Sequence, residues 1–139
     1  MPTSLGLRHV NLNVADLARS IRFYRQVFGL EVVQEITETI TKNGRQVDLR
    51  QALLRTPGAG DLLALTQAAS FPIGPGGVNH LGFVFASDAD VEAAVAVVAD
   101  AGGLVLRRGA REGRGAPEVF AYVSDPDGYA IELSTQEVP

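Results

Sequence analysis

The pattern of apolar and polar positions predicts the same order of elements twice along the chain. In the first half, residues 7–14 alternate between polar and apolar side chains as a half-buried strand does. Apolar side chains then recur at helical spacing over residues 17–28, between Asp16 at an N-cap position and Gly29, which suits the left-handed end of a helix. Three strands bounded by turn residues are predicted next, at residues 30–40, 47–55 and 61–67.

After a Pro- and Gly-rich stretch at residues 71–77, the order repeats. A strand is predicted at residues 78–85, followed by a helix that starts after Ser87 or Asp88 and carries valines along one face. The last strands are predicted at residues 104–108, 118–124 and 129–135, and the final two are joined by a turn at 125–128. Each half therefore reads βαβββ.

The two halves place the only two histidines of the chain at matching points. His9 and His80 stand 71 positions apart (80 − 9), each near the start of the first strand of its half. The last strand of the second half carries Glu132 within an apolar run, where an unpaired charge is costly, and the matching position in the first half is Ala64. A lone histidine on a strand is more often a hydrogen-bonded structural residue than a ligand. The duplicated placement together with Glu132 favours a metal site instead.

Length and composition narrow the classes of protein. With 139 residues, of which 46% are hydrophobic, the chain suits one domain over 1–139, made of module one at 5–70, a linker at 71–77 and module two at 78–136. It has no apolar run of the roughly 20 residues that a membrane span needs and no N-terminal secretory pattern, so a cytoplasmic protein without a membrane partner is expected. A net charge of −4 without a basic stripe argues against nucleic acid and favours a small molecule as partner.

The absence of cysteine restricts any metal site to nitrogen and oxygen ligands. Two neutral imidazoles and one carboxylate leave coordination positions open for water, oxygen or a bidentate substrate. His9, His80 and Glu132 would suit one divalent metal ion, and Fe, Mn, Zn and Ni are all compatible with this set. Such an ion acts as a Lewis acid that polarises a substrate carbonyl or hydroxyl.

Two stretches carry a resemblance to a known family. Residues 7–17, together with Phe23-Tyr24 and Phe28-Gly29-Leu30, and residues 122–133 resemble the vicinal oxygen chelate superfamily. This superfamily includes glyoxalase I, extradiol dioxygenases, fosfomycin-resistance enzymes, methylmalonyl-CoA epimerase and bleomycin-resistance proteins. The resemblance implies an α+β fold in which two tandem βαβββ modules form an open, curved mixed β-sheet, a cup, with the helices outside. It also implies that His9, His80 and Glu132 hold a divalent cation and that the protein is a homodimer.

The resemblance does not select one branch of the superfamily. Glyoxalase I uses a fourth ligand, a carboxylate, where this chain has Ala64, and methylmalonyl-CoA epimerase also has an additional ligand in the first half. Extradiol dioxygenases have a tyrosine ten residues before the glutamate, as Tyr122 is here, but they use a further histidine for acid–base work. Fosfomycin-resistance enzymes have a threonine where this chain has Asn11, and a basic anchor where residues 133–139 contain no Lys or Arg.

Tyr122 and Glu132 are the candidates for catalytic residues. Tyr122 would donate a hydrogen bond to a metal-bound oxygen, although a buried tyrosine with a backbone partner is equally ordinary. If Tyr122 faces the metal, strand alternation places Phe120 on the same face as a candidate for substrate binding.

Two further candidates for substrate binding come from the first half. Alignment of the modules places Arg50, with Ala52 and Leu54, on the face that matches Tyr122, where its guanidinium would hold a carboxylate or phosphate; a solvent-facing arginine is the alternative. Asn11, two places after the first histidine, is the other candidate. The Gly/Arg-rich residues 107–115 are expected to form a mobile loop at the rim of the cup, either a lid or a surface connection.

These features favour a divalent-metal-dependent enzyme of the glyoxalase or dioxygenase type, that is, a lyase, isomerase or dioxygenase acting on a small carbonyl, enol or catechol-like substrate. The alternatives are a metal-free, bleomycin-resistance-like protein that binds a small molecule or drug, and a fosfomycin-resistance-like transferase. Binding members of the superfamily usually lack the two histidines and the glutamate, so their presence favours catalysis. Phosphate-binding loops and the nucleophile elbow of serine hydrolases are absent from the sequence.

Overall fold

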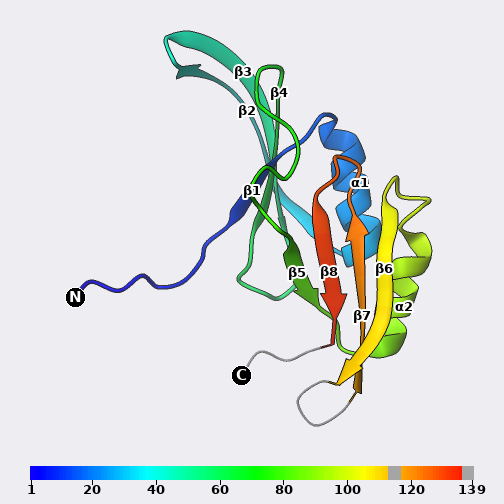
Figure 1. Ribbon diagram of the computed structural model, residues 1–139. Coiled ribbons are helices and arrows are strands. Elements are labelled where there is room, and N and C mark those ends of the chain that lie inside the picture. Colours follow the sequence, from blue (N-terminus) through cyan, green and yellow to red (C-terminus); the bar gives the residue numbers. More distant parts are fainter. Residues whose placement is uncertain (113–116, 136–139) are drawn as a thin grey trace.

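Two βαβββ modules follow each other along the chain in the computed structural model, which describes residues 1–112 and 117–135 (Figure 1). The strands of the first module lie in the order β1-β4-β3-β2, with β1 parallel to β4 and the other neighbours antiparallel. Its elements are β1 (Val10–Asn13), α1 (Leu17–Phe28), β2 (Glu31–Lys42), β3 (Arg45–Arg55) and β4 (Leu63–Ala68).

The second module repeats this arrangement. Its strands lie in the order β5-β8-β7-β6, with β5 parallel to β8. Its elements are β5 (Leu81–Val84), α2 (Asp88–Val97), β6 (Leu104–Glu112), β7 (Pro117–Ser124) and β8 (Ala130–Ser134). The predicted α+β fold of two βαβββ modules is confirmed, and the described strands form two separate four-stranded sheets.

Helix α1 begins and ends where the sequence predicts. The carboxylate of Asp16 accepts a hydrogen bond from the backbone N–H of Arg19 at 3.0 Å, which satisfies one of the free donors of the first turn. Gly29 ends the helix with a φ of 67°, a left-handed conformation that costs glycine nothing, and its N–H donates to the carbonyl of Arg25. In α2 the N-cap is Ser87, the first of the two predicted candidates.

The two modules pack against each other through their helices and through aromatic rings. Helix α1 contacts α2, and Phe28 of α1 lies against Phe83 of β5 with the ring centroids 4.5 Å apart. One hydrophobic core extends through both modules and includes Leu65 of β4 and Ile131 of β8. Because both modules contribute to this core, packing fixes the position of one sheet relative to the other.

The turn between β7 and β8 adds a polar connection between the modules. Asp125 is only 2% exposed, and one oxygen of its carboxylate accepts hydrogen bonds from the backbone N–H groups of Asp127 and Tyr129, each at 2.9 Å. The other oxygen accepts a hydrogen bond from the hydroxyl of Tyr24 on α1 at 2.7 Å. Burial raises the pKa of Asp125 above its ordinary value, against the opposing effect of the Tyr24 hydrogen bond. Burial, followed by the charge of Asp125, raises the pKa of Tyr24 well above its ordinary value.

Asp127 makes a second set of contacts from the same turn. One carboxylate oxygen accepts hydrogen bonds from the backbone N–H of Ala15 at 3.2 Å and from the guanidinium of Arg19 at 3.0 Å. The other accepts a hydrogen bond from the hydroxyl of Ser20 at 3.3 Å. Asp125 and Asp127, called the aspartate clasp below, therefore hold the start and the middle of α1 against the second module.

The segment expected to be a mobile rim loop is a strand over most of its length. Residues 107–112 belong to β6 and pair with β7, so the loop prediction is wrong for them, whereas residues 113–115 lie outside the described residues. Strands β2 and β3 are longer than predicted and project from the body as a hairpin that turns at Asn43 and Gly44 (Figure 1). No helix among the described residues is long and apolar enough to cross a membrane.

Candidate functional site

The open face of the second sheet, on the side away from the helices, brings together a histidine, a tyrosine and a glutamate. Tyr122 of β7 is the register partner of Glu132 on β8, and Gly82 of β5 is the partner of Glu132 on its other side. Successive side chains of a strand alternate between faces, so these residues lie opposite core residues such as Ile131. His80 stands two positions before Gly82 and therefore shares the open face.

Glu132 is the centre of this group. Its Oε2 lies 3.1 Å from Nε2 of His80 and accepts a hydrogen bond from the hydroxyl of Tyr122 at 2.9 Å. The rings of His80 and Tyr122 meet edge to face with centroids 5.2 Å apart. The side chains of His80 and Glu132 are 32% and 16% exposed, so both groups remain in contact with solvent. The group is thus ordered by its own contacts and still reachable by a ligand.

Asn79 determines which of the two ring nitrogens of His80 carries the hydrogen. The amide oxygen of Asn79 lies 2.5 Å from Nδ1 of His80 and can only accept a hydrogen bond, so Nδ1 is the donor. In the neutral imidazole, Nε2 is then an acceptor that faces the acceptor oxygen of Glu132. Two acceptors at this separation need a positive charge shared between them, supplied either by a proton on Nε2 or by a metal ion. The donor set of His80 and Glu132 therefore fits one side of a metal site.

The open face of the first sheet carries a different set of polar residues. Gln51 of β3 donates a hydrogen bond to the hydroxyl of Thr66 on β4 at 3.0 Å, and Thr66 donates in turn to the amide oxygen of Asn11 on β1 at 2.8 Å. Asn11 thus lies on the open face, where it accepts a hydrogen bond from Thr66 of the neighbouring strand. Ala64, the register partner of Asn11, leaves this face without a carboxylate at the position that matches Glu132.

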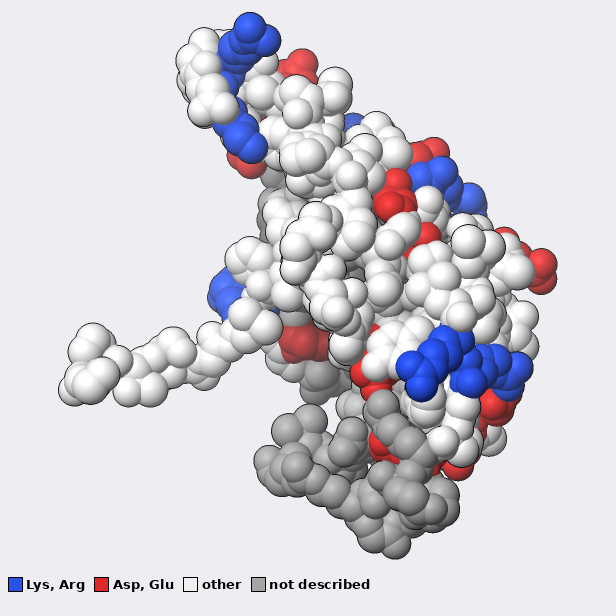
Figure 2. Space-filling model, in the orientation of Figure 1, with Lys and Arg blue, Asp and Glu red and all other residues white. Residues whose placement is uncertain are grey.

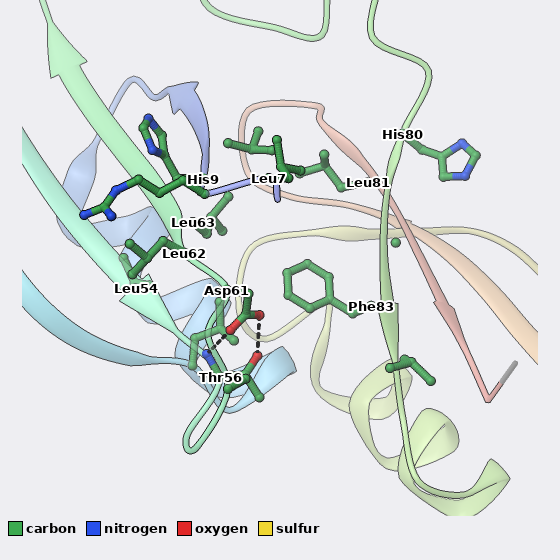
Figure 3. A pocket seen from close by; sticks show the side chains of 16 residues that line it. Leu7, His9, Leu54, Thr56, Asp61, Leu62, Leu63, His80, Leu81 and Phe83 are labelled. Atoms are coloured by element: carbon green, nitrogen blue, oxygen red, sulfur yellow. Dashed lines mark hydrogen bonds between the residues drawn. The ribbon is translucent and has the colours of Figure 1, made fainter. Parts of the chain in front are cut away.

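His9 lies apart from the other two predicted ligands within one chain. His9 and His80 line opposite walls of a pocket of about 530 Å³ between the modules, and their rings point away from each other (Figure 3). Most of the pocket is lined by apolar side chains of the two modules, such as Leu63 and Phe83. Among residues 1–112 and 117–135, no three His, Cys, Asp or Glu side chains lie close enough to hold a metal ion. One chain therefore brings together two of the three predicted ligands.

Arg50 lies on the opposite face from the one expected. Ala52 and Leu54 are fully buried in the core beneath the helices, and Arg50 shares their face of β3. The open face of β3 carries Gln51 and Leu53 instead, as the pairing of Leu53 with Ala64 shows. The alignment of the two modules was one residue out at this strand, and a shift of one residue reverses the direction of every side chain.

Two residues with contacts on the open face were not singled out from the sequence. Asn79 had one signal, its place directly before a histidine. Arg107 lies where the predicted strand at 104–108 overlaps the predicted loop at 107–115; it is the register partner of Tyr122, and its guanidinium lies over the ring of Phe120 with 5.2 Å between Cζ and the ring centroid. Phe120 shares the face of Tyr122 as predicted, and it is 4% exposed.

Comparison with known families agrees with this arrangement. The pattern of the glyoxalase/bleomycin resistance protein/dioxygenase superfamily matches residues 6–133, which include both modules. The chain belongs to this superfamily. Within the superfamily, this chain is 31% identical over 128 residues to a probable lactoylglutathione lyase of Vibrio cholerae, which covers 90% of this chain and 86% of the relative. It is 30% identical over 134 residues to the lactoylglutathione lyase of Salmonella typhimurium, covering 93% and 91% of the two chains.

Solved structures of superfamily proteins share the fold. A glyoxalase family protein from Bacillus cereus superposes with a TM-score of 0.76 at 17% identity, covering 96% of this chain and 95% of the other. A fosfomycin resistance protein from Listeria monocytogenes, complexed with Mn(II) and a dihydroxypropylphosphonic acid, superposes with a TM-score of 0.69 at 20% identity and covers 98% and 96%. These two structures share the two-module architecture of this chain.

Proposed function

We propose that this superfamily member is a divalent-metal-dependent enzyme acting on a small oxygen-bearing substrate, with His80 and Glu132 as metal ligands and Tyr122 beside them. The observation that carries the proposal is the contact of 3.1 Å between Nε2 of His80 and Oε2 of Glu132, with Nδ1 already engaged by Asn79. A histidine oriented in this way by a neighbouring acceptor is typical of metal sites, because the second partner sets both tautomer and ring direction.

The third ligand, His9, would come from a second copy of the chain in a homodimer. His9 lies on the open-face side of the first sheet, and packing fixes that sheet in a position where it does not approach His80 and Glu132 of its own chain. A two-fold dimer that places the first module of one copy against the second module of the other would complete two identical sites. Strands β1 and β5 are both edge strands, so their edges are available for such an arrangement.

The residues of the chain have separate tasks in this scheme. The metal, when bound, supplies Lewis-acid polarisation of a substrate carbonyl, enol or catechol oxygen. Tyr122 donates a hydrogen bond from its hydroxyl to Glu132 Oε2 and is in place to donate to a substrate oxygen that replaces this contact. Phe120 is buried and packs edge to face against the ring of Tyr122, and Asn11 would reach the site from the module that carries His9.

The relatives and the ligand set point to different reactions within the superfamily. The curated relatives of about 30% identity are lactoylglutathione lyases, which supports an isomerase or lyase reaction. Ala64 stands where the glyoxalase I branch has a fourth, acidic ligand, so a reaction that needs only three protein ligands fits these residues better. We therefore propose the general class, metal-assisted chemistry at a substrate oxygen, and not the glutathione-dependent reaction in particular.

A metal-free binding protein is the second candidate. It is favoured by one observation: the pocket between the modules is lined mainly by leucines, valines and Phe83, which suits an apolar ligand. In that case a proton on His80 Nε2 would bridge to Glu132, and the pair would be an ordinary ion pair.

Metal content separates the two candidates. Protein purified without chelator is analysed for bound metal, alongside His80→Ala and Glu132→Ala variants and a control variant, Glu38→Ala, whose carboxylate lies on an exposed part of β2. Near-stoichiometric metal in the wild type and the control, with loss in both site variants, supports the enzyme. A wild type that binds no Fe, Mn, Zn or Ni even after reconstitution would contradict it.

Mixing two inactive variants tests the site between chains. In a dimer of one His9→Ala and one Glu132→Ala subunit, one site lacks both His9 and Glu132, and the other site keeps all three ligands. Random exchange of subunits should therefore restore about a quarter of the wild-type sites. A site within one chain predicts no recovery at all. Recovery is measured as bound metal after co-refolding, with each variant alone as the control.

A further inference from the structure

A row of aromatic rings crosses the open face of the second sheet, from the proposed metal ligands to β6. The ring of Tyr122 meets His80 edge to face at 5.2 Å between centroids, and Phe120 meets Tyr122 in the same manner at 6.0 Å. Tyr122 and Phe120 are neighbours on the same face of β7. Tyr122 is the partly exposed ring of this row beside His80 and Glu132, whereas Phe120 is 4% exposed and lies beneath the guanidinium of Arg107.

Gly109 leaves room for the ring of Phe120 to pack against the neighbouring strand β6. It is the register partner of Phe120, and a Cβ atom added at Gly109 would lie 2.9 Å from Cζ of the phenyl ring. Any larger residue there would push the ring away from β6. The glycine in this Gly/Arg-rich stretch thus has a packing role on the open face.

Arg107 ends the row with a positive charge. Its guanidinium lies over the ring of Phe120, and among the described residues it has no carboxylate within ion-pair distance. Glu118, on the same face of β7, is buried and has contacts of its own. A guanidinium stacked on an aromatic ring keeps the N–H donors of its edge available for a bidentate partner.

The adjacent arginine provides a contrast within the same strand. Arg108 points to the other face of β6, where it forms an ion pair with Glu92 of α2. Figure 2 shows basic side chains gathered beside β6 and α2, and a second group at the tip of the β2–β3 hairpin. The two neighbouring arginines therefore differ in their surroundings. Arg108 forms an ion pair with Glu92 on the helix side of the sheet, whereas Arg107 lies on the open face, beside the candidate site.

We propose that Arg107 binds the anionic group of the substrate, and that the substrate is a small, flat molecule with a carboxylate at one end and metal-binding oxygens at the other. Arg107, Tyr122 and Glu132 lie in one register row across three adjacent strands, which places the backbones of Arg107 and Glu132 about 10 Å apart. The long side chains shorten this span, and the ring of Tyr122, which stands between them in the row, suits a planar carbon skeleton. This inference rests on the proposed metal site for the far end of the substrate.

Binding of two matched probes tests the role of Arg107. Catechol and protocatechuate share the same pair of vicinal hydroxyls, and only protocatechuate carries a carboxylate. Their dissociation constants are measured by calorimetry on protein loaded with Zn(II), which is not redox-active, for the wild type, Arg107→Gln and Arg108→Gln. The preference for protocatechuate over catechol should fall about five- to tenfold in Arg107→Gln and stay unchanged in Arg108→Gln. An equal fall in both variants, or none in Arg107→Gln, would overturn the proposal.

A second arm on metal-free protein separates this inference from the proposed function. Benzoate and benzyl alcohol are titrated while the backbone amide signals of β6 and β7 are followed by NMR. Wild type should prefer benzoate, and Arg107→Gln should lose that preference. If Zn(II) fails to bind but this preference exists, the metal site is wrong and the anion site stands. If Zn(II) binds and benzoate is not preferred by the wild type, the anion site is wrong and the metal site stands.

Discussion

Removal of a single oxygen from helix α1 provides a direct test of how the modules are joined. Tyr24→Phe deletes the hydroxyl that donates to the carboxylate of Asp125 at 2.7 Å, in a place where the tyrosine is fully buried. The ring itself remains, with its contacts to Phe23 and Phe28 at centroid distances of 5.2 and 5.9 Å. The variant therefore isolates one hydrogen bond of the aspartate clasp from the surrounding aromatic packing.

The size of the effect follows from the charge and burial of the acceptor. A hydrogen bond to a charged group contributes about 1.5–3 kcal/mol, and the burial of Asp125 keeps bulk solvent from replacing the lost donor. For a chain of this length, that loss lowers the melting temperature by on the order of 5–10 °C. The matched control is Tyr122→Phe, which also deletes a hydroxyl bound to a carboxylate, but Glu132 is partly exposed. Water can replace that donor, so the control should lose no more than about 1 kcal/mol.

The stability difference between wild type and Tyr24→Phe should also depend on pH. The pKa of Asp125 is raised in the folded state by burial, so the stability linked to its protonated form is lost as the pH rises through the folded pKa. The Tyr24 hydrogen bond lowers that pKa, so deleting it raises the pKa further and extends the loss to higher pH. The gap in unfolding free energy between wild type and Tyr24→Phe should therefore widen as the pH rises from about 4 upward.

Urea denaturation followed by far-UV circular dichroism measures both quantities, at a series of pH values between about 4 and 8. A loss below about 0.5 kcal/mol at neutral pH would show that the clasp contributes little to stability. A gap that narrows with rising pH would refute the assignment of Asp125 as a carboxylate stabilised by Tyr24.

Two further predictions concern packing and the orientation of His80. Gly103→Ala should destabilise the fold by about 2–4 kcal/mol in thermal denaturation, because the new Cβ would lie 2.3 Å from the carbonyl oxygen of Ser124, whereas Gly60→Ala, with nothing within 4 Å, should change it little. Equal stability of the two alanine variants would contradict this packing. Asn79→Ala should weaken Zn(II) binding about tenfold or more without unfolding the protein, measured by competition with a chromophoric chelator, because His80 loses the partner that orients it. Asn79→Asp keeps an acceptor oxygen and should restore most of the affinity for Zn(II). If Asn79→Ala and Asn79→Asp bind Zn(II) equally well, the orienting role of Asn79 is refuted.

Local signals in the sequence were sufficient to predict the helices and strands, but not how the two modules pack against each other. Asp16 and Gly29 marked the ends of α1 correctly because cap chemistry depends on neighbours in the chain. The meeting of the two sheets depends on contacts between distant residues, such as Phe28 with Phe83, and no periodicity reports these. The separation of His9 from His80 and Glu132 within one chain was therefore not foreseen.

Errors in the lining of the site have a similar origin. The face of Arg50 depended on an alignment of the two modules that was one residue out, and strand geometry turns such a small error into the opposite face. Residues 107–112 have the Gly- and Arg-rich composition of a loop, but pairing with β7 makes them a strand. Within that strand Gly109 serves the ring of Phe120, which only the three-dimensional arrangement reveals.

The aspartate clasp affects how resemblance to this superfamily should be interpreted. The stretch Asp125-Pro126-Asp127-Gly128 is among the most recognisable parts of the sequence, and its two carboxylates are occupied with α1 and its own backbone. These four residues connect the second module to α1 and thus have a structural role that is independent of the reaction. Prediction of chemistry from homologous chains should therefore give more weight to the residues at the proposed site, His80, Glu132, Ala64 and Arg107, than to this turn.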